Sequence, residues 1–214
     1  RTLLGTLAAA CATGLALSPA TARGQVLDSL GVNLFGLRLQ LIEDLPGTFR
    51  ALRRMGLTRV EMTSFRGWDG HPYGSFAALA PMTGEQVAAA LADAGLTTHS
   101  SHVVPAEVTP ERLPATLDWM PPLGETTLIV AGPPADAHEP LASGQAIDGL
   151  NAVGERLARN GCKLAIHGDY SLWERHEGAL WFDRIAQHVD PALCQVQLDL
   201  GATLQSGIDP LAAF

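Results

Sequence analysis

Four side chains that can transfer a proton or bind a metal ion stand at the ends of four predicted strands. They are Glu61, His102, His167 and Asp199. Carboxylates and imidazoles serve as general acids and bases, and mixed oxygen and nitrogen donors suit Mn²⁺, Mg²⁺ or Zn²⁺. A charge that closes an apolar run needs a partner, and a metal ion is one such partner. The pattern predicts one site for proton transfer or metal binding, with four unrelated strand-end caps or ion pairs as the alternative.

Strand-like and helical segments alternate along the chain, with a period of about 30 residues that is typical of βα units on a parallel sheet. The predicted strands are Phe35–Leu41, Arg59–Met62, Thr97–Val103, Thr126–Ala131, Lys163–His167 and Gln195–Leu200. The predicted helices are Pro46–Met55, Thr83–Ala94, Glu111–Met120, Gln145–Asn160 and Glu177–His188, and a further one opens at Asp209 and Pro210. The strands are largely apolar, as expected for a parallel sheet that is buried on both faces.

Two architectures fit repeated βα units, a doubly wound sheet and a (β/α)8 barrel. No dinucleotide-binding fingerprint, phosphate-binding loop or G-x-S-x-G elbow occurs, which weakens the first. In a barrel the carboxyl ends of the strands meet at one mouth, where active sites lie. Alternation with period 2 then places two side chains on one face at each of three strand ends. The pairs are Ser100 with His102, His167 with Asp169, and Gln197 with Asp199.

An aromatic and polar segment, residues 66–73, follows the second predicted strand. Aromatic rings line small-molecule sites and cover the apolar faces of sugars, so the segment predicts a sugar-binding rim. We expect Arg66, Trp68 and His71 to contact the substrate, together with Asp169 near the fifth strand. An ordinary loop rich in Gly and Pro is the alternative.

The chain is acidic and apolar, with 14 Lys and Arg against 22 Asp and Glu, and 47% hydrophobic residues. This composition predicts a globular protein rather than a disordered chain, and its lack of a basic stripe argues against nucleic acid as a partner. Three Cys residues exclude a disulfide scaffold. Cys162 and Cys194 fall beside predicted strands, where we expect buried apolar side chains rather than a disulfide.

The first 22 residues have the organisation of a secretory signal peptide. Arg1 carries their one charge, an apolar run follows, and the segment ends in Ala20-Thr21-Ala22. We expect cleavage after this A-x-A sequence by the Sec route, or by the Tat route if an Arg precedes Arg1. The mature domain, residues 23–214, is then periplasmic or secreted and has no membrane contact. A buried N-terminal helix and a lipoprotein signal at Cys11 are the alternatives.

Several short motifs resemble the sugar phosphate isomerase/epimerase family of xylose isomerase-like TIM barrels in their order and spacing. They run from Gly36-Leu37-Arg38-Leu39 through Val60-Glu61, Ser100-Ser101-His102, Ala165-Ile166-His167 and Leu198-Asp199-Leu200-Gly201 to Gly207-Ile208-Asp209-Pro210. The resemblance implies a divalent metal (Mn²⁺, Mg²⁺ or Zn²⁺) held at the barrel mouth by carboxylates and histidine. His167 and Asp199 lie where two of those ligands are expected, and Glu61 and His102 lie where the family lines its substrate pocket.

The chain departs from the family pattern at two positions. His167-Gly168-Asp169 stands where the family often has His-Asn-His, and Ala202 stands where an aromatic residue often follows the sixth strand. About six βα units precede Phe214, whereas a barrel has eight strands. We therefore expect an incomplete barrel that lacks its last two units, which bring a further histidine and glutamate ligand in the family, and we expect the fragment to be inactive.

The resemblance implies a sugar isomerase or epimerase that works through an enediolate, with a metal stabilising the oxyanion. Glu61 and His102 are the expected catalytic residues, for proton transfer or hydroxyl binding. A lyase or hydrolase on oxidised glycosides is an alternative, because the same site can expel a leaving group. A non-catalytic carbohydrate-binding barrel is another. The expected partner is a small sugar, and homo-oligomerisation is left open.

Overall fold

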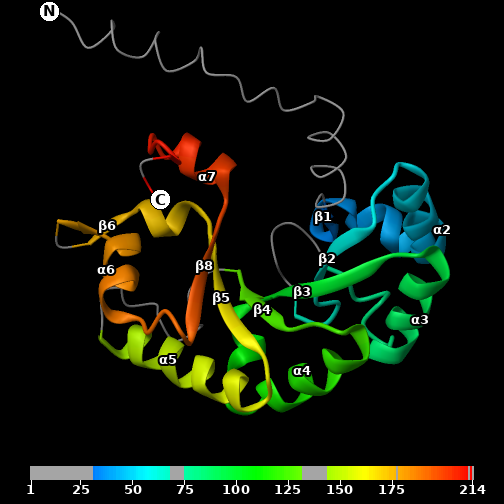
Figure 1. Cartoon of the computed structure of the whole chain (residues 1–214), viewed down its shortest axis with the longest axis horizontal. Helices are drawn as coiled ribbons and strands as arrows, with labels where there is room; N and C mark the ends of the chain where they lie inside the picture. Colours follow the sequence, from blue (N-terminus) through cyan, green and yellow to red (C-terminus); the bar gives the residue numbers. More distant parts are fainter. Residues whose placement is uncertain (1–30, 68–74, 132–143, 177, 212, 214) are drawn as a thin grey trace, which may run out of the picture. The chain divides into compact units, whose positions relative to one another are not determined.

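The computed structural model describes residues 31–67, 75–131, 144–176, 178–211 and 213, and these form one compact unit with a six-stranded parallel sheet. The strands are β1 (Gly31–Asn33), β2 (Arg59–Thr63), β3 (Thr97–Val103), β4 (Thr127–Val130), β5 (Lys163–Gly168) and β8 (Cys194–Leu198). Their order in the sheet, β1-β2-β3-β4-β5-β8, follows their order in the chain. The sheet curls into half of a barrel (Figure 1), which confirms the predicted incomplete (β/α)8 architecture.

Helices connect successive strands, and α3, α4 and α5 lie along the outer side of the curved sheet (Figure 1). The helices are α2 (Arg38–Arg54), α3 (Gly84–Ala94), α4 (Leu113–Trp119), α5 (Gly144–Arg159), α6 (Trp181–His188) and α7 (Leu200–Gln205). Short 3-10 turns are η3 (Leu34–Leu37), η4 (Pro105–Val108), η5 (Pro121–Leu123) and η6 (Tyr170–Trp173). None of the described helices is both long and apolar enough to cross a membrane.

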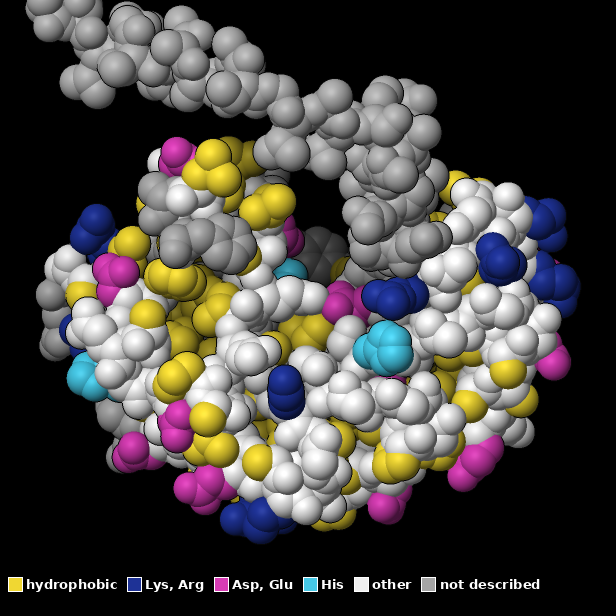
Figure 2. All heavy atoms as spheres, in the orientation of Figure 1, with side chains coloured by type: hydrophobic (Ala, Val, Ile, Leu, Met, Phe, Trp, Pro, Cys, Tyr) yellow, Lys and Arg dark blue, Asp and Glu magenta, His cyan; other side chains and the backbone are white. Residues whose placement is uncertain are grey.

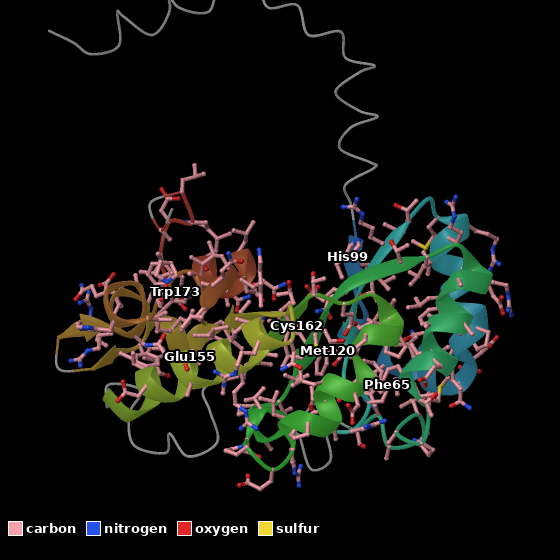
Figure 3. All side chains as sticks on the ribbon, turned by 60° about the horizontal axis from the view of Figure 1, so that its bottom comes forward. Phe65, His99, Met120, Glu155, Cys162 and Trp173 are labelled. Carbon is pink, nitrogen blue, oxygen red and sulfur yellow. The ribbon has the colours of Figure 1, made fainter. Side chains whose placement is uncertain are left out.

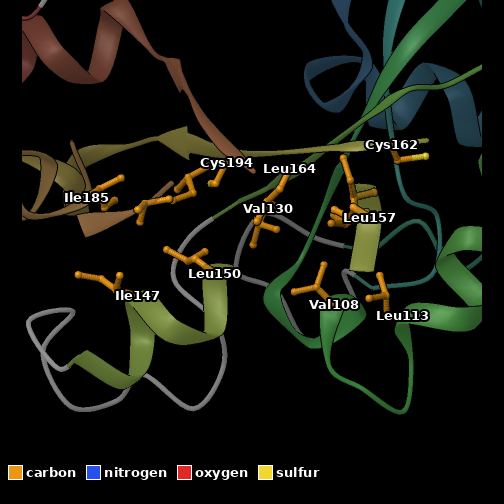
Figure 4. Close-up of a cluster of buried hydrophobic side chains, with 14 of the residues drawn as sticks. Val108, Leu113, Val130, Ile147, Leu150, Leu157, Cys162, Leu164, Ile185 and Cys194 are labelled. Atoms are coloured by element: carbon orange, nitrogen blue, oxygen red, sulfur yellow. The ribbon is translucent and has the colours of Figure 1, made fainter. Parts of the chain in front are cut away.

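The apolar core fills the layer between the sheet and these helices. One cluster joins β4 and β5 to α5 (Figure 4), where Leu128, Leu157 and Leu164 have no exposed surface. Burying each such side chain contributes about 1.5–3 kcal/mol. Cys162 and Cys194 belong to this cluster, and both are buried and free, as predicted.

Local sequence signals account for the best-predicted elements. Thr83 and Gln86 form the predicted capping box of α3, each side chain bonding the other's backbone N–H. Gly95 ends the helix in the left-handed region, with φ of 71°, where glycine is favoured. The strand predicted at Thr97–Val103 has the same bounds in the structure.

The predicted strand Phe35–Leu41 is wrong. The first strand ends at Asn33, whose side chain accepts a hydrogen bond from the Phe35 N–H and caps η3. Helix α2 follows at once, because its apolar residues recur at helical spacing and are buried. The predicted helix start at Pro46 is found as a kink inside α2, where Asp44 leaves helical geometry and accepts from the Gly47 N–H.

The predicted helix Glu177–His188 also starts too early. An antiparallel hairpin of β6 (Arg175–His176) and β7 (Ala179–Leu180) precedes α6, and Glu177 lies outside the described residues. Helix α7 was not predicted. It begins directly after β8, because Asp199 caps it by accepting from the Ala202 N–H. Figure 2 shows exposed apolar side chains around α7. Leu200 and Leu204 of this helix are 54% and 61% exposed.

The register between β2 and β3 shifts in the middle of the two strands. Val60 pairs with Thr98 but Met62 pairs with Ser101, so that Glu61 alone faces two residues of β3. An extra residue of this kind is a β-bulge, which re-aims the neighbouring side chains and recurs beside active sites.

Because of the bulge, the polar side chains of β3 contact two different carboxyl groups. Ser100 and His102 contact one carboxylate, on β2, whereas Thr98 and Ser101 both contact another, Glu125. Under strict alternation Thr98 would share a face with Ser100 and His102. The bulge therefore gives β3 a separate polar set on each face.

Glu125 is a buried carboxyl group directly before β4, with 5% of its surface exposed. Ser101 Oγ donates to its Oε1 at 2.7 Å and Thr98 Oγ1 at 3.5 Å, while Oε2 has no partner in the part of the chain that is described. Burial raises the pKa of Glu125 to about 7, against the lowering effect of these two hydrogen bonds, and the charge of Glu61 adds to the rise.

Replacing this carboxyl group should change how stability depends on pH. Between its ordinary pKa of 4.5 and about 7, the unfolded chain releases a proton that folded Glu125 keeps. The free energy of unfolding therefore falls as pH rises through this window, by about 3 kcal/mol. We expect Glu125→Gln to remove this fall and to exceed the wild type in stability at pH 8, as measured by urea denaturation at pH 5 and 8.

The matched control is Glu43→Gln, at an exposed glutamate of α2. It should follow the wild-type pH profile. A Glu125→Gln profile that runs parallel to the wild type would contradict the assignment of Glu125 as the titrating group.

Candidate active site

An open cavity of about 600 Å³ lies at the carboxyl ends of the parallel strands, where barrels of this kind carry their active sites. Its polar wall comes from β1, β2, β3, β5 and β8 and the turns that follow them: Asn33, Glu61, His102, His167, Asp169, Gln197 and Asp199. Phe35 and Tyr170 add aromatic surface. The structure therefore brings together all four of the residues from which the sequence predicted a site.

Glu61 is the centre of the polar network in this cavity. Its Oε1 accepts from Asn33 Nδ2 at 2.8 Å and lies 3.0 Å from His102 Nε2. Its Oε2 accepts from Ser100 Oγ at 2.9 Å and from Gln197 Nε2 at 2.7 Å. Four side chains from β1, β3 and β8 thus converge on one carboxylate of β2.

The same contacts keep Glu61 ionised. Burial raises its pKa, but the hydrogen bond from His102, the attraction of this ring when it is protonated, and hydrogen bonds from Asn33 and Ser100 lower it to about 2. A carboxylate this acidic, with donors on both oxygens, is a weak proton acceptor at neutral pH. The roles predicted for Glu61 were proton transfer and hydroxyl binding, whereas the geometry favours a third role, holding its neighbouring side chains in place.

His102 is buried and held by two acceptors. Its Nε2 lies 2.7 Å from Gln197 Oε1 and 3.0 Å from Glu61 Oε1. The amide nitrogen of Gln197 donates to Glu61, which fixes the amide oxygen toward His102. We infer from this network that Nε2 carries a hydrogen. Nδ1 is then the nitrogen that can accept a proton, and the carboxylate stabilises the imidazolium that results.

His167 and Asp199 form a second pair beside this network. His167 Nε2 lies 3.5 Å from Asp199 Oδ2, and the His167 ring meets the His102 ring edge-on, with centroids 4.9 Å apart. Burial lowers the pKa of His167, and the charge of His102 lowers it further, although Asp169, Asp199 and Glu61 act in the opposite direction. The lowered pKa favours the neutral form of His167, in which one ring nitrogen keeps a lone pair.

The His167–Asp199 pair fits part of a metal site. Asp199 Oδ1 accepts from the Ala202 N–H at 2.9 Å, which leaves Oδ2 facing His167. Ligand atoms about 3 Å apart suit adjacent positions around a divalent ion, and such ions take roughly four to six ligands. No group of three or more His, Cys, Asp or Glu is placed to hold a metal among the residues described. The described residues thus supply two ligands for a divalent ion and do not complete its coordination shell.

The predicted substrate contacts are only partly in this cavity. Asp169 lines it, but one of its carboxylate oxygens caps η6 by accepting from the Ser171 N–H and hydroxyl. Arg66 instead lines a different cavity, next to α4. Trp68 and His71 lie outside the described residues.

Three residues of the site were not predicted as functional. Asn33 was missed because the first strand was placed too late, and no pattern in the sequence marks it. Gln197 shares the predicted face of Asp199, so alternation along β8 could have found it had amides been considered beside charges. Tyr170 lies on the rim, where its hydroxyl donates to Gln205 Oε1 at 2.8 Å.

No protein-family model and no curated protein sequence matches the chain. Among solved structures, the fold is similar to that of a sugar phosphate isomerase/epimerase from Parabacteroides distasonis ATCC 8503. The TM-score is 0.70 at 21% identity, over 86% of this chain and 69% of that one. The likeness identifies the fold as that of a xylose isomerase-like TIM barrel, here incomplete, and so confirms the resemblance seen in the sequence at the level of fold.

Two further solved structures share this fold. A xylose isomerase-like TIM barrel protein from Mycobacterium smegmatis in complex with magnesium has a TM-score of 0.54 at 16% identity, over 81% of this chain and 65% of that one. The probable 3-DHS dehydratase AsbF from Bacillus anthracis has a TM-score of 0.61 at 15% identity, over 86% of this chain and 67% of that one. Because this fold serves more than one reaction, the function has to be argued from the site.

The ionised Glu61 should make the fold sensitive to acid. Its pKa of about 2 lies below the ordinary 4.5, so its contribution is present above pH 4.5 and is lost as pH falls toward 2. After allowance for solvent screening, the contribution is about 2 kcal/mol. We expect Glu61→Gln to lose about this much stability at pH 7, because its amide group faces donors, and to lose less than the wild type on acidification.

Urea denaturation at pH 7, 5 and 3 measures this difference. Glu155→Gln, at an exposed glutamate of α5, is the matched control and should leave the profile unchanged. A Glu61→Gln variant as stable as the wild type at pH 7 would show that the four contacts on the carboxylate contribute nothing.

Proposed function

We propose that the protein is a sugar isomerase or epimerase that moves a proton on a carbon next to a carbonyl group, through an enediolate. The observation that supports this proposal is the network of His102 with ionised Glu61 and Gln197 in the cavity at the strand ends. The network orients an imidazole and stabilises its charged form, as proton abstraction from carbon requires.

In this proposal His102 Nδ1 takes the proton from the substrate carbon. Glu61 stabilises the imidazolium, and Gln197 keeps the hydrogen of Nε2 directed away from the substrate. His167, neutral and at the same wall, accepts or donates a hydrogen bond at a substrate hydroxyl. Return of the proton from His102 to the other carbon of the enediolate, with transfer of the hydroxyl proton from one enediolate oxygen to the other, gives the isomer. Protonation of the same carbon on its opposite face, by water or a second acid, gives the epimer.

We further propose that His167 and Asp199 contribute to binding a divalent cation, Mn²⁺, Mg²⁺ or Zn²⁺. When bound, such an ion would polarise the carbonyl oxygen of the substrate. Two protein donors leave positions for water and substrate oxygens, a mode that Mg²⁺ commonly adopts. One structure with the same fold is in complex with magnesium, which is consistent with this proposal.

Two other functions use the same cavity. A lyase or hydrolase on oxidised glycosides would begin with the same proton abstraction and then expel a leaving group, and one structure with this fold is a probable dehydratase. A non-catalytic carbohydrate-binding barrel is consistent with a described donor set of only two metal ligands. In each case the proposed partner is a small sugar. A periplasmic or secreted location remains a proposal from residues 1–22, which lie outside the described residues.

Proton exchange with solvent tests the proposed chemistry. The intact protein is incubated in D₂O with ketoses, aldoses and oxidised sugars, and loss of the carbon-bound proton is followed by NMR. We expect exchange with at least one of them, and a fall of roughly 10²–10⁴-fold in His102→Gln. His99→Gln is the control, because His99 lies on the same strand and is exposed (Figure 3).

The products separate the candidates. Isomerised or epimerised sugar supports the proposal, while an eliminated or hydrolysed product identifies the lyase or hydrolase. Tight sugar binding without exchange, in the presence of added cations, would contradict the enzyme proposal and favour the binding protein.

Binding of Mn²⁺, followed by electron paramagnetic resonance, tests the cation proposal separately. With two protein donors we expect a weak dissociation constant of about 10⁻⁴–10⁻³ M, by comparison with other weakly held divalent ions. Asp199→Asn should abolish this binding and still cap α7, since asparagine is an equally good cap. Asp93→Asn, at an exposed site of α3, should not change it. Mn²⁺ bound equally well by Asp199→Asn would contradict this assignment.

A further inference from the structure

A second cavity, of about 200 Å³, lies between α4 and the strands β3 and β4. It shares no lining residue with the candidate active site. Arg66, which the sequence placed in a sugar-binding rim, lines this cavity instead. The proposed reaction uses none of the residues that line this second cavity, so any ligand that it binds would be separate from the substrate of the first cavity.

The inner wall of the cavity is apolar. Val103 and Leu128 come from the strands, and Trp119 and Met120 (Figure 3) from the end of α4, all at most 8% exposed. Apolar cavities of about 150 Å³ stay dry and bind benzene, so this volume suits a compound with one aromatic ring or a branched chain.

One carboxyl group is built into this wall. Glu107 is 6% exposed, and its oxygens accept from the Ser64 hydroxyl and, at 3.1 Å, from the Val104 N–H. Burial raises the pKa of Glu107, although those bonds and the charges of Arg66 and Arg112 act in the opposite direction. The group is thus fixed in place, and burial favours its protonated, neutral form.

Charged side chains surround the opening. Arg66 and Arg112 are exposed, and no described residue forms an ion pair with either guanidinium. Glu111 is also exposed and lines the same cavity. Two guanidinium groups that form no ion pair within the described residues lie beside an apolar interior, and together they complement a molecule with an anionic head and an apolar body.

We propose that this cavity is a second small-molecule site, which binds a carboxylate whose apolar body is about the size of one ring. The carboxylate lies at Arg66 and Arg112, and the apolar body enters against Trp119 and Met120. The proposal is independent of the function of the first cavity.

Calorimetric titration with phenylacetate and with its neutral amide, phenylacetamide, tests the proposal on the intact protein. We expect the acid to bind at least about tenfold more tightly than the amide, since the arginines recognise the charge. Arg112→Gln should weaken phenylacetate binding by about five- to tenfold, whereas Glu111→Gln should strengthen it by about two- to threefold. Arg54→Gln, at an exposed arginine of α2, should have no effect.

The opposite effects expected for the Arg112 and Glu111 variants on phenylacetate affinity distinguish this site from unspecific apolar binding. His167→Gln, in the first cavity, should leave phenylacetate binding unchanged. Loss of phenylacetate binding in this variant would show that the ligand occupies the first cavity, and it would overturn the proposal. Equal binding of acid and amide, no detectable binding of phenylacetate, or equal affinities of the Arg112 and Glu111 variants would also overturn it.

Discussion

The hydrogen bond between Gln197 and Glu61 joins two residues 136 positions apart in sequence, on strands four places apart in the sheet. A flat sheet would separate such strands by about 19 Å, at 4.8 Å per strand. The 2.7 Å contact therefore depends on the curl of the sheet, which brings β8 back toward β2. Since Asn33 and Ser100 also donate to Glu61, one ionised carboxylate connects β1, β2, β3 and β8 across the concave face.

A partly buried charge such as that of Glu61 is stable because donors surround it, and Glu125 shows the contrast within the same molecule. Glu61 receives hydrogen bonds from several side chains and has a pKa of about 2, whereas Glu125 receives two and has a pKa of about 7. The β-bulge separates them, because it directs Ser101 to Glu125 and leaves Ser100 for Glu61. One added residue in β3 thus divides the serine hydroxyl donors between two carboxyl groups whose pKa values are shifted in opposite directions.

Much of the architecture could be predicted from local patterns, because each signal extends over only a few residues. Examples are the cap at Thr83, the glycine at position 95 and the short apolar runs that form strands. The error at Phe35–Leu41 had a local cause too, since the cap at Asn33 turns an apolar run into a helix. The site was predictable only for its charged members. Asn33 and Gln197 are neutral amides whose role exists only once distant strands meet, and strict period 2 cannot foresee a bulge.

The distribution of hydrogen bonds in the cavity bears on which chemistry it serves. His102 is held at one nitrogen by two partners, a geometry that sets its tautomer, while His167 and Asp199 face each other at 3.5 Å without a third described ligand. In this chain the hydrogen-bond donors gather around Glu61, and Glu61 and Gln197 in turn orient the imidazole of His102. The fold also occurs in a sugar phosphate isomerase/epimerase and in a probable dehydratase, so the chemistry of this cavity has to be argued from how Glu61 and Gln197 hold His102.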